Sequence, residues 1–317
     1  MITLNNGREL VRIDKWQDVL DLPGYTETVD PATAQLKDII GNYVEGEPVL
    51  CGLSTCRQPH GRGYLVVTED GRVTNIGHVC GKNNFSVEFQ AMANRFNRDL
   101  RIKSYKEAIR RFISRTMEYE DRVAELRNGD QGADVMHRRI RQLMAPGGPV
   151  PEIIRRHLRN MARTGKNALM MERRATAQDR DLQAGMRGGA GKRGGPYRSF
   201  VAERVGTIDG LAALYDENNL GDLLVRDIEV GIARICAMDI EDATEHQLRQ
   251  EDKWVGGIDA KLERAEAAIQ DGRRLFSRKN LEQFLPLLDD PRQRKAFLSY
   301  LASLPESDHQ KQAAHSS

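Results

Sequence analysis

The sequence predicts a mainly α-helical protein with a small α+β module at its N-terminus, and three observations lead to this prediction. Three of the four cysteines lie within residues 51–80, around a segment that has the alternating apolar pattern of a β-hairpin. Apolar residues then recur in steps of three and four over residues 86–129, as they do on one face of a helix. Aromatic residues make up 6% and charged residues 30% of the chain, which is typical of helices that face water.

The length and the charge of the chain limit what it can be. With 317 residues, of which 39% are hydrophobic, it is long enough for two domains with their own cores. Its net charge is −3 over residues 1–85, +12 over residues 86–200 and −7 over residues 201–317. We therefore expect the middle of the chain to meet a polyanion, or the acidic last third to fold back on it. The N-terminus has no signal sequence and no apolar run is long enough for a bilayer, so we expect a cytoplasmic protein without membrane contact.

The first elements are predicted to be two short strands and two short helices. Residues 2–4 and 9–13 alternate around Asn5-Asn6-Gly7, where Asn-Gly favours a tight hairpin turn. Residues 15–20 follow as a helix, opened by the capping box of Asp14 and Gln17. A second helix is expected over residues 31–41, with Asp30 as its cap.

The cysteine-rich segment has the composition of a metal site, with the spacing C-x4-C-x21-H-x-C for Cys51, Cys56, His78 and Cys80. Zinc favours four thiolate and imidazole ligands in tetrahedral geometry. Between the two ligand pairs, residues 64–68 and 72–76 are predicted to be strands joined through Asp70-Gly71. His78 is the expected fourth ligand because alternate residues at the end of a strand lie on one face.

Two alternatives remain for this segment. His60, four residues after Cys56, is a second candidate for the fourth ligand. The cysteines could also be small buried hydrophobic residues, or Cys51 and Cys56 could form a disulfide. Cys236, which lies in an apolar stretch far from the other three, is expected to be a core residue of a helix.

The fragments CGLSTC, GYLVVTEDGRVTNIG and HVCGKNNF, within residues 51–85, together resemble a treble-clef zinc finger. The resemblance implies a cysteine knuckle, a hairpin and ligands at the start of a helix, all around one Zn²⁺. The chain departs from the usual treble clef, because four residues separate the cysteines of the knuckle and the last two ligands are not a C-x2-C pair. Residues 1–85 are accordingly expected to form one zinc-binding module.

A long helix is predicted from an N-cap at Ser86 to about Gly129, either as one helix or as two nearly collinear ones. A second helical stretch is expected over residues 151–170. Its apolar face and that of the long helix would pair in a helical hairpin or coiled coil, or the same stripe would form a homo-oligomer. This basic region, residues 86–183, is followed by a glycine- and arginine-rich linker, residues 184–196.

The rest of the chain is predicted to be a helical C-terminal domain, residues 197–304, followed by a disordered tail, residues 305–317. Ser277 and Asp290 are expected caps, and Pro291 suits a first helical position. The predicted elements are a short strand over residues 200–205 and helices over residues 209–215, 220–240, 244–270, 278–288 and 291–304.

Arginines and lysines recur along the predicted helices at steps that would form a ridge of positive charge. Arginine suits phosphate because its planar guanidinium donates two hydrogen bonds at once. The alternative is a solvated surface whose charges are neutralised by neighbouring acids. The predicted nucleic-acid contacts are Arg95, Arg98, Arg101, Lys106, Arg110, Arg155, Arg159 and Arg163.

These features together predict a non-enzymatic zinc-finger protein that binds nucleic acid, DNA in preference to RNA, through a basic helical body. A first alternative is a helical scaffold or assembly subunit in which zinc is structural and the basic region binds an acidic protein. A second is a metal-dependent nuclease of the treble-clef kind, in which His60 or His78 would activate water and Asn83 or Asn84 would position it.

Overall fold

The computed structural model describes residues 2–5, 10–187 and 199–305, and the chain divides into two compact units. The head unit comprises Met1–Ile113 together with Met238–Val255. The helical unit comprises Ser114–Ala237 and Gly256–Ser317. Helices dominate the chain, as predicted, and a small antiparallel sheet lies at the N-terminus. Among the described residues, no helix is both long enough and apolar enough to span a bilayer.

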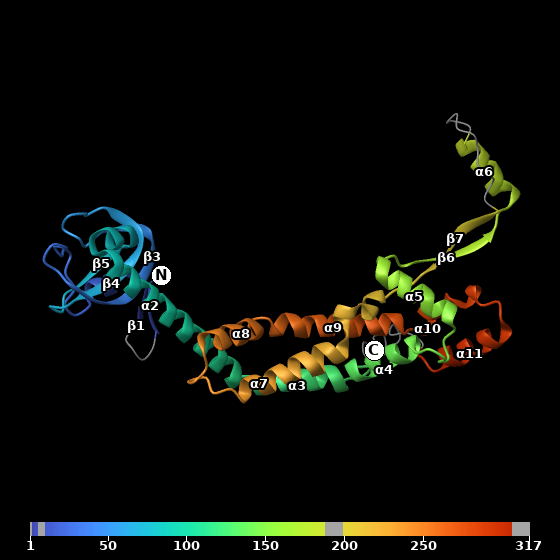
Figure 1. Cartoon of the computed structure of the whole chain (residues 1–317). Helices are drawn as coiled ribbons and strands as arrows, with labels where there is room; N and C mark the ends of the chain where they lie inside the picture. Colours follow the sequence, from blue (N-terminus) through green and yellow to red (C-terminus); the bar gives the residue numbers. More distant parts are fainter. Residues whose placement is uncertain (1, 6–9, 188–198, 306–317) are drawn as a thin grey trace, which may run out of the picture. The chain divides into compact units, whose positions relative to one another are not determined.

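The head unit is built on a five-stranded antiparallel sheet with the order β2-β1-β3-β4-β5, drawn in blue in Figure 1. The predicted strands at the start of the chain and on both sides of Asp70-Gly71 are confirmed, and so is the short helix after β2. The turn predicted at residues 5–7 lies mostly outside the described residues. The elements are β1 (Ile2–Asn5), β2 (Leu10–Ile13), α1 (Trp16–Leu20), β3 (Leu36–Leu50), β4 (Pro59–Thr68) and β5 (Val73–Gly77).

The helix predicted over residues 31–41 is wrong, because most of that segment belongs to strand β3. Asp30 does act as a cap, and its carboxylate accepts a hydrogen bond from the Ala32 N–H at 2.9 Å, but only a turn follows. Ile39, Gly41 and Tyr43 are buried while the residues between them are more exposed. This alternation is the period of a strand, and it buries Ile39 against β4 and Tyr43 against β1.

Helix α2 (His78–Ser114) follows β5 directly and begins eight residues before the predicted cap at Ser86. Ser86 instead breaks the helix, with φ 49° and ψ −126°. The first turns and the longer part of α2 are thereby set at an angle, so that Phe89 packs back against Gly81. Near its end α2 contacts α8 (Glu245–Val255) of the same unit, where Phe112 meets Trp254 edge to face.

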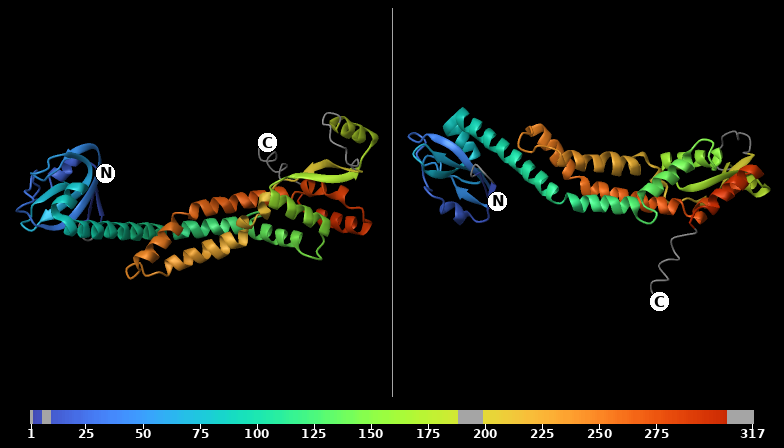
Figure 2. Two further views of the ribbon diagram at one scale, coloured as in Figure 1. Left: turned by 45° about the horizontal axis from the view of Figure 1, so that its top comes forward. Right: turned by 90° about the horizontal axis from the view of Figure 1, so that it is seen from below.

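The helical unit is built around α9, which packs against α3, α4, α10 and the π-helix η3. Figures 1 and 2 show α9, in orange, alongside α3 and α4, in green. The predicted end of the long helix at Gly129 is confirmed, since Gly129 is the C-cap of α3. The elements are α3 (Thr116–Asn128), α4 (Ala133–Met144), α5 (Glu152–Thr164), η1 (Leu211–Leu214), η2 (Asp216–Asn218), η3 (Gly221–Glu229), α7 (Val230–Cys236), α9 (Ile258–Leu275), α10 (Arg278–Glu282), η4 (Leu285–Leu287) and α11 (Pro291–Ala302).

Among the predicted helices, one extends too far and another is interrupted. The helix expected over residues 151–170 ends as α5 at Thr164, because Gly165 takes a left-handed conformation with φ 67°. Leu169 and Met170 lie instead in β6 (Ala168–Arg174). The helix expected over residues 244–270 is interrupted between α8 and α9 at Gly256-Gly257. The caps predicted at Ser277 and Asp290 are confirmed, with side chains that accept hydrogen bonds from backbone N–H groups.

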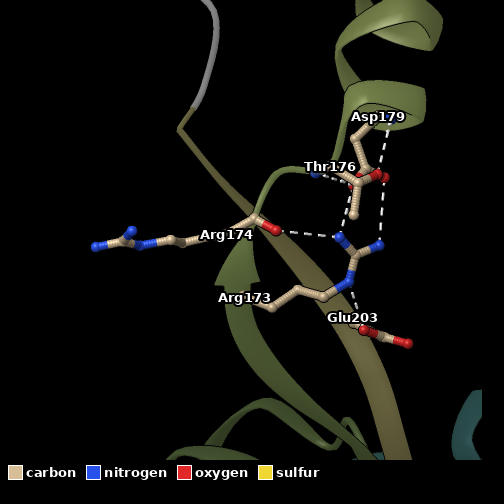
Figure 3. A network of polar contacts seen from close by, with 5 residues as sticks. All are labelled: Arg173, Arg174, Thr176, Asp179 and Glu203. Atoms are coloured by element: carbon tan, nitrogen blue, oxygen red, sulfur yellow. Dashed lines mark hydrogen bonds and ion pairs between the residues drawn. The ribbon is translucent and has the colours of Figure 1, made fainter.

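Strand β6 pairs with β7 (Phe200–Thr207), which confirms the short strand predicted over residues 200–205. Helix α6 (Ala177–Arg187) follows β6. Figure 3 shows how Arg173 joins these three elements: its guanidinium binds Asp179 at 2.6 Å and Glu203 at 2.6 Å. The Asp179 carboxylate also accepts hydrogen bonds from Thr176, so its pKa is well below the usual range. Residues 188–198, most of the predicted linker, and residues 306–317, most of the predicted tail, lie outside the described residues.

Candidate metal centre and basic surfaces

The first two cysteines lie in a tight loop between β3 and β4. The Cys51 N–H donates to the Gln58 carbonyl at 3.0 Å, which closes the loop at its base. At its tip, the Leu53 carbonyl accepts hydrogen bonds from the N–H groups of Cys56 at 3.0 Å and Arg57 at 3.2 Å. The loop therefore folds back on itself as the knuckle predicted from the sequence, with both thiols at one end.

This knuckle is attached to β5, the strand that leads to the third cysteine. The Gly52 N–H donates to the Asn75 carbonyl at 2.7 Å, and the Asn75 side chain donates to the Leu50 carbonyl at 2.8 Å. Gly52 lies so close to β5 that a Cβ atom there would be 2.0 Å from Thr74 Oγ1. Only glycine fits this approach, which holds the knuckle in register with the start of α2.

Cys80 completes the cluster from the first turn of α2. The thiol sulfurs of Cys51, Cys56 and Cys80 all lie within 4.8 Å of one another, and those of Cys56 and Cys80 are 3.2 Å apart. Cys51 is fully buried and the other two are partly buried. The three thiols belong to a hydrophobic cluster that includes Phe89.

In the absence of metal, the surroundings of Cys80 favour its neutral thiol. Burial, together with the neighbouring thiols of Cys56 and Cys51, raises the pKa of Cys80 to about 12. The protein alone therefore keeps a proton on the Cys80 sulfur at neutral pH. A divalent cation reverses this preference because it stabilises thiolates directly.

The donor set fits zinc. A tetrahedral ion with Zn–S bonds of about 2.3 Å needs sulfurs about 3.8 Å apart, which lies within the spread of the three thiols. All four cysteines are free thiols in the structure, which does not contain the disulfide considered for Cys51 and Cys56. The chain can therefore bind a metal ion through three cysteines.

Neither candidate for a fourth ligand belongs to this group of three. His78 lies exposed at the first residue of α2, with its ring 6.0 Å from that of Tyr64 and 6.4 Å from that of Phe89. The expectation that His78 and Cys80 share a face assumed a strand. Both residues lie in a helix, where positions two apart point in nearly opposite directions.

His60 lies on β4 beside Tyr43, whose hydroxyl is 3.3 Å from both ring nitrogens. Tyr43 is buried, and burial is the main cause of its raised pKa, to which Cys51 and Cys80 contribute. The phenol of Tyr43 therefore lies near the thiols and also contacts His60.

The predicted basic ridge on α2 is largely paired within the head unit. Arg101 binds Glu245 at 3.3 Å, Lys106 binds Glu241 at 2.8 Å, and Arg110 also binds Glu241. Lys106 and Arg110 hold the pKa of Glu241 below its usual value. Both acids belong to Met238–Val255, so this part of the acidic last third does fold back on the basic helix.

The predicted contacts on α5 are also engaged. Arg155 is 6% exposed, and its guanidinium donates to the carbonyls of Ala145 and Val150. Arg159 pairs with Glu152, and Arg163 donates to the Asn160 side chain at 3.2 Å. Arg155 thus has a structural role in place of the predicted phosphate contact.

Two pairs of exposed arginines on helices have no partner among the described residues. Arg95 and Arg98 lie three residues apart on α2, as do Arg138 and Arg141 on α4. The second pair was not among the predicted contacts. Its signal was the strong amphipathicity of residues 133–144, which places both arginines on the polar face of one helix.

Cys236 is exposed, so the prediction that it belongs to a helix core is wrong. It is the last residue of α7, whose buried face is formed by Ile232 and Ile235. A residue that directly follows a buried one on a helix is turned away by about 100°. The Cys236 thiol lies 3.5 Å from the Thr116 hydroxyl.

Comparison of the chain with protein-family models, with curated proteins and with solved structures gave no match.

Proposed function

We propose that the protein is a non-enzymatic, zinc-stabilised protein that binds nucleic acid through unpaired arginines on its helices. Cys51, Cys56 and Cys80 hold one Zn²⁺, which links the knuckle to the start of α2 and contributes to the folding free energy of the head unit. Thiolate ligands of this kind need a reducing compartment, for which we propose the cytoplasm.

The observation that carries the proposal is the contrast between paired and unpaired arginines. On α2, Arg101 and Arg110 already have carboxylate partners, whereas Arg95 and Arg98 have none among the described residues. An unpaired surface arginine loses no ion pair when it binds a phosphate. We favour duplex DNA because its major groove admits a helix, whereas the deep, narrow major groove of A-form RNA does not.

The test is the affinity of the full-length zinc-loaded protein for a labelled 20-base-pair DNA, measured by fluorescence anisotropy at several salt concentrations. Affinity should fall steeply with salt, because bound phosphates release counterions. The double substitution Arg95→Ala and Arg98→Ala should weaken binding more than Arg101→Ala and Arg110→Ala, which removes the same charge. Absence of binding at low ionic strength would contradict the proposal.

A second candidate is a helical scaffold in which zinc is structural and the basic surface binds an acidic protein. The three ion pairs made by Glu241 and Glu245 favour it, because through them α2 already accepts carboxylates from the segment Met238–Val255. A scaffold of this kind would bind an acidic peptide in the same assay and leave DNA unbound.

A further inference from the structure

The helical unit contains a cavity of about 730 Å³ between α4 and the start of η3. This volume lies within the range of sites for small ligands and cofactors. Its lining combines apolar side chains such as Leu220 and Val225 with the amides of Gln142 and Asn219. The cavity thus offers both an apolar surface and hydrogen-bonding groups to one ligand.

The cavity also has an excess of positive charge. Four arginines and two aspartates line it. Arg127 forms two hydrogen bonds of 3.0 Å with Asp134, and Arg226 binds Asp222 at 2.6 Å. These pairs account for both acids of the lining, and Arg127 has a further partner in Glu229 at 2.6 Å.

Arg138 and Arg141 supply the remaining charge, and neither has a partner in the described part of the chain. They are three residues apart on α4, so both guanidinium groups extend from one face of the helix toward the same opening. The N-terminus of η3 is not the source of attraction, because Asn219 Oδ1 already accepts hydrogen bonds from the N–H groups of Gly221 and Asp222 at 3.1 and 3.4 Å.

We propose that this cavity binds the phosphate of one nucleotide between Arg138 and Arg141, with the base against the apolar wall of Leu220 and Val225. Two guanidinium groups suit a phosphate ester, which accepts several charge-assisted hydrogen bonds. The choice of a nucleotide over other phosphate esters rests on the proposed function. The nucleotide is either free or part of a bound strand, and the two sources share this chemistry.

The experiment uses the full-length zinc-loaded protein and two probes. AMP, with adenosine as the ligand without phosphate, is titrated by calorimetry. A labelled 20-nucleotide single strand is titrated by anisotropy, with AMP as competitor. The pocket variant carries Arg138→Ala and Arg141→Ala, and its matched control carries Arg156→Ala and Arg264→Ala, two exposed arginines of the same unit outside the cavity. A third variant, Arg138→Lys with Arg141→Lys, keeps the charge and removes the planar guanidinium.

If the nucleotide is free, AMP binds, adenosine does not, and the pocket variant loses at least tenfold in affinity while its control is unchanged. If the nucleotide belongs to a strand, the pocket variant loses at least tenfold more affinity for the single strand than the control does. The lysine variant does not restore this affinity. Equal losses in both alanine variants, with no AMP binding, would overturn the pocket and leave the proposed function standing. AMP binding without any binding of DNA would support the pocket and overturn the proposed function.

Discussion

The thiols of Cys56 and Cys80 lie 3.2 Å apart although 24 residues separate them in the chain. The hairpin of β4 and β5 accounts for this approach, because its two strands return the chain to the knuckle. Cys51 lies in the same group of three, from the base of that knuckle. The sheet thus brings the three sulfurs together. Hydrogen bonds from Asn75 to the Leu50 carbonyl, and from the Gly52 N–H to the Asn75 carbonyl, hold the knuckle against β5.

We expect Cys80→Ser to abolish zinc binding. A hydroxyl is a much weaker zinc ligand than a thiolate, and the two remaining thiolates cannot enclose the ion. Metal analysis of the purified protein should show about one zinc per chain for the wild type and almost none for the variant. Chelation should lower the melting temperature of the wild type and leave that of Cys80→Ser unchanged.

Cys236→Ser is the matched control, because Cys236 is an exposed thiol far from the cluster in sequence and should retain the wild-type zinc content. His78→Ala and His60→Ala test the two candidates for the fourth ligand in the same assay. The histidine whose substitution causes loss of zinc is the fourth ligand. Wild-type protein without metal would contradict the centre as a whole.

We expect the affinity for zinc to rise with pH. The pKa of Cys80, raised to about 12 in the absence of metal, keeps this thiol protonated between pH 6 and 8, so zinc must displace its proton. Release of one proton increases the apparent affinity about tenfold per pH unit, and further thiols that release protons add to this slope. Competition with a chromophoric chelator at pH 6.5 and 7.5 measures it. An affinity independent of pH would show that the thiols were already ionised.

Gly52→Ala should destabilise the head unit by about 1–3 kcal/mol, because the added methyl group overlaps Thr74 Oγ1 and the Asn75 carbonyl. Gly46→Ala, on β3 before the knuckle, is the control, since a Cβ at Gly46 meets nothing within 4 Å. Chemical denaturation of the zinc-loaded proteins compares them. Equal stability of the two variants would mean that the knuckle is not held against β5.

The sequence predicted which elements form this site better than it predicted where they begin and which way their side chains point. Alternating apolar residues located β4 and β5, and the cysteine spacing located the knuckle, because both signals are local. The role of Ile39 was missed, since a capping aspartate and a proline opened a helical pattern that tertiary pairing with β4 overrode. His78 was assigned to a strand end, and a shift of the helix start by eight residues was enough to change the direction of its side chain.

The sequence also did not predict which basic residues are paired with acids. Composition revealed an excess of basic residues in the middle of the chain, but the partners of Lys106 and Arg110 lie more than 130 residues away in sequence. Likewise, no local pattern distinguishes the buried Arg155 from the exposed Arg156 beside it. Long-range pairing decides which arginines remain available, and pairing of this kind has no signature in a single sequence.

Arg155→Ala should destabilise the helical unit by about 2–4 kcal/mol. Its guanidinium satisfies the carbonyls of Ala145 and Val150 at the turn before α5, and these groups would lose a buried charged donor. Arg156→Ala removes the same charge from the exposed face of the same helix and should change stability by less than about 0.5 kcal/mol. Thermal denaturation of the two variants provides the comparison, and equal melting temperatures would contradict the structural role of Arg155.

Glu241→Ala should strengthen the binding of DNA. Glu241 pairs with both Lys106 and Arg110, so its removal frees two cations on α2 from their carboxylate partner, whereas exposed ion pairs of this kind contribute little to stability. Asp242→Ala is the matched control, because it removes the same charge from the next residue, which has no basic partner among the described residues. Greater affinity in Glu241→Ala than in Asp242→Ala, at unchanged melting temperature, is the expected result of the anisotropy assay. If both substitutions raise the affinity equally, only the net charge matters, and the pairing of Glu241 does not regulate access to the basic ridge.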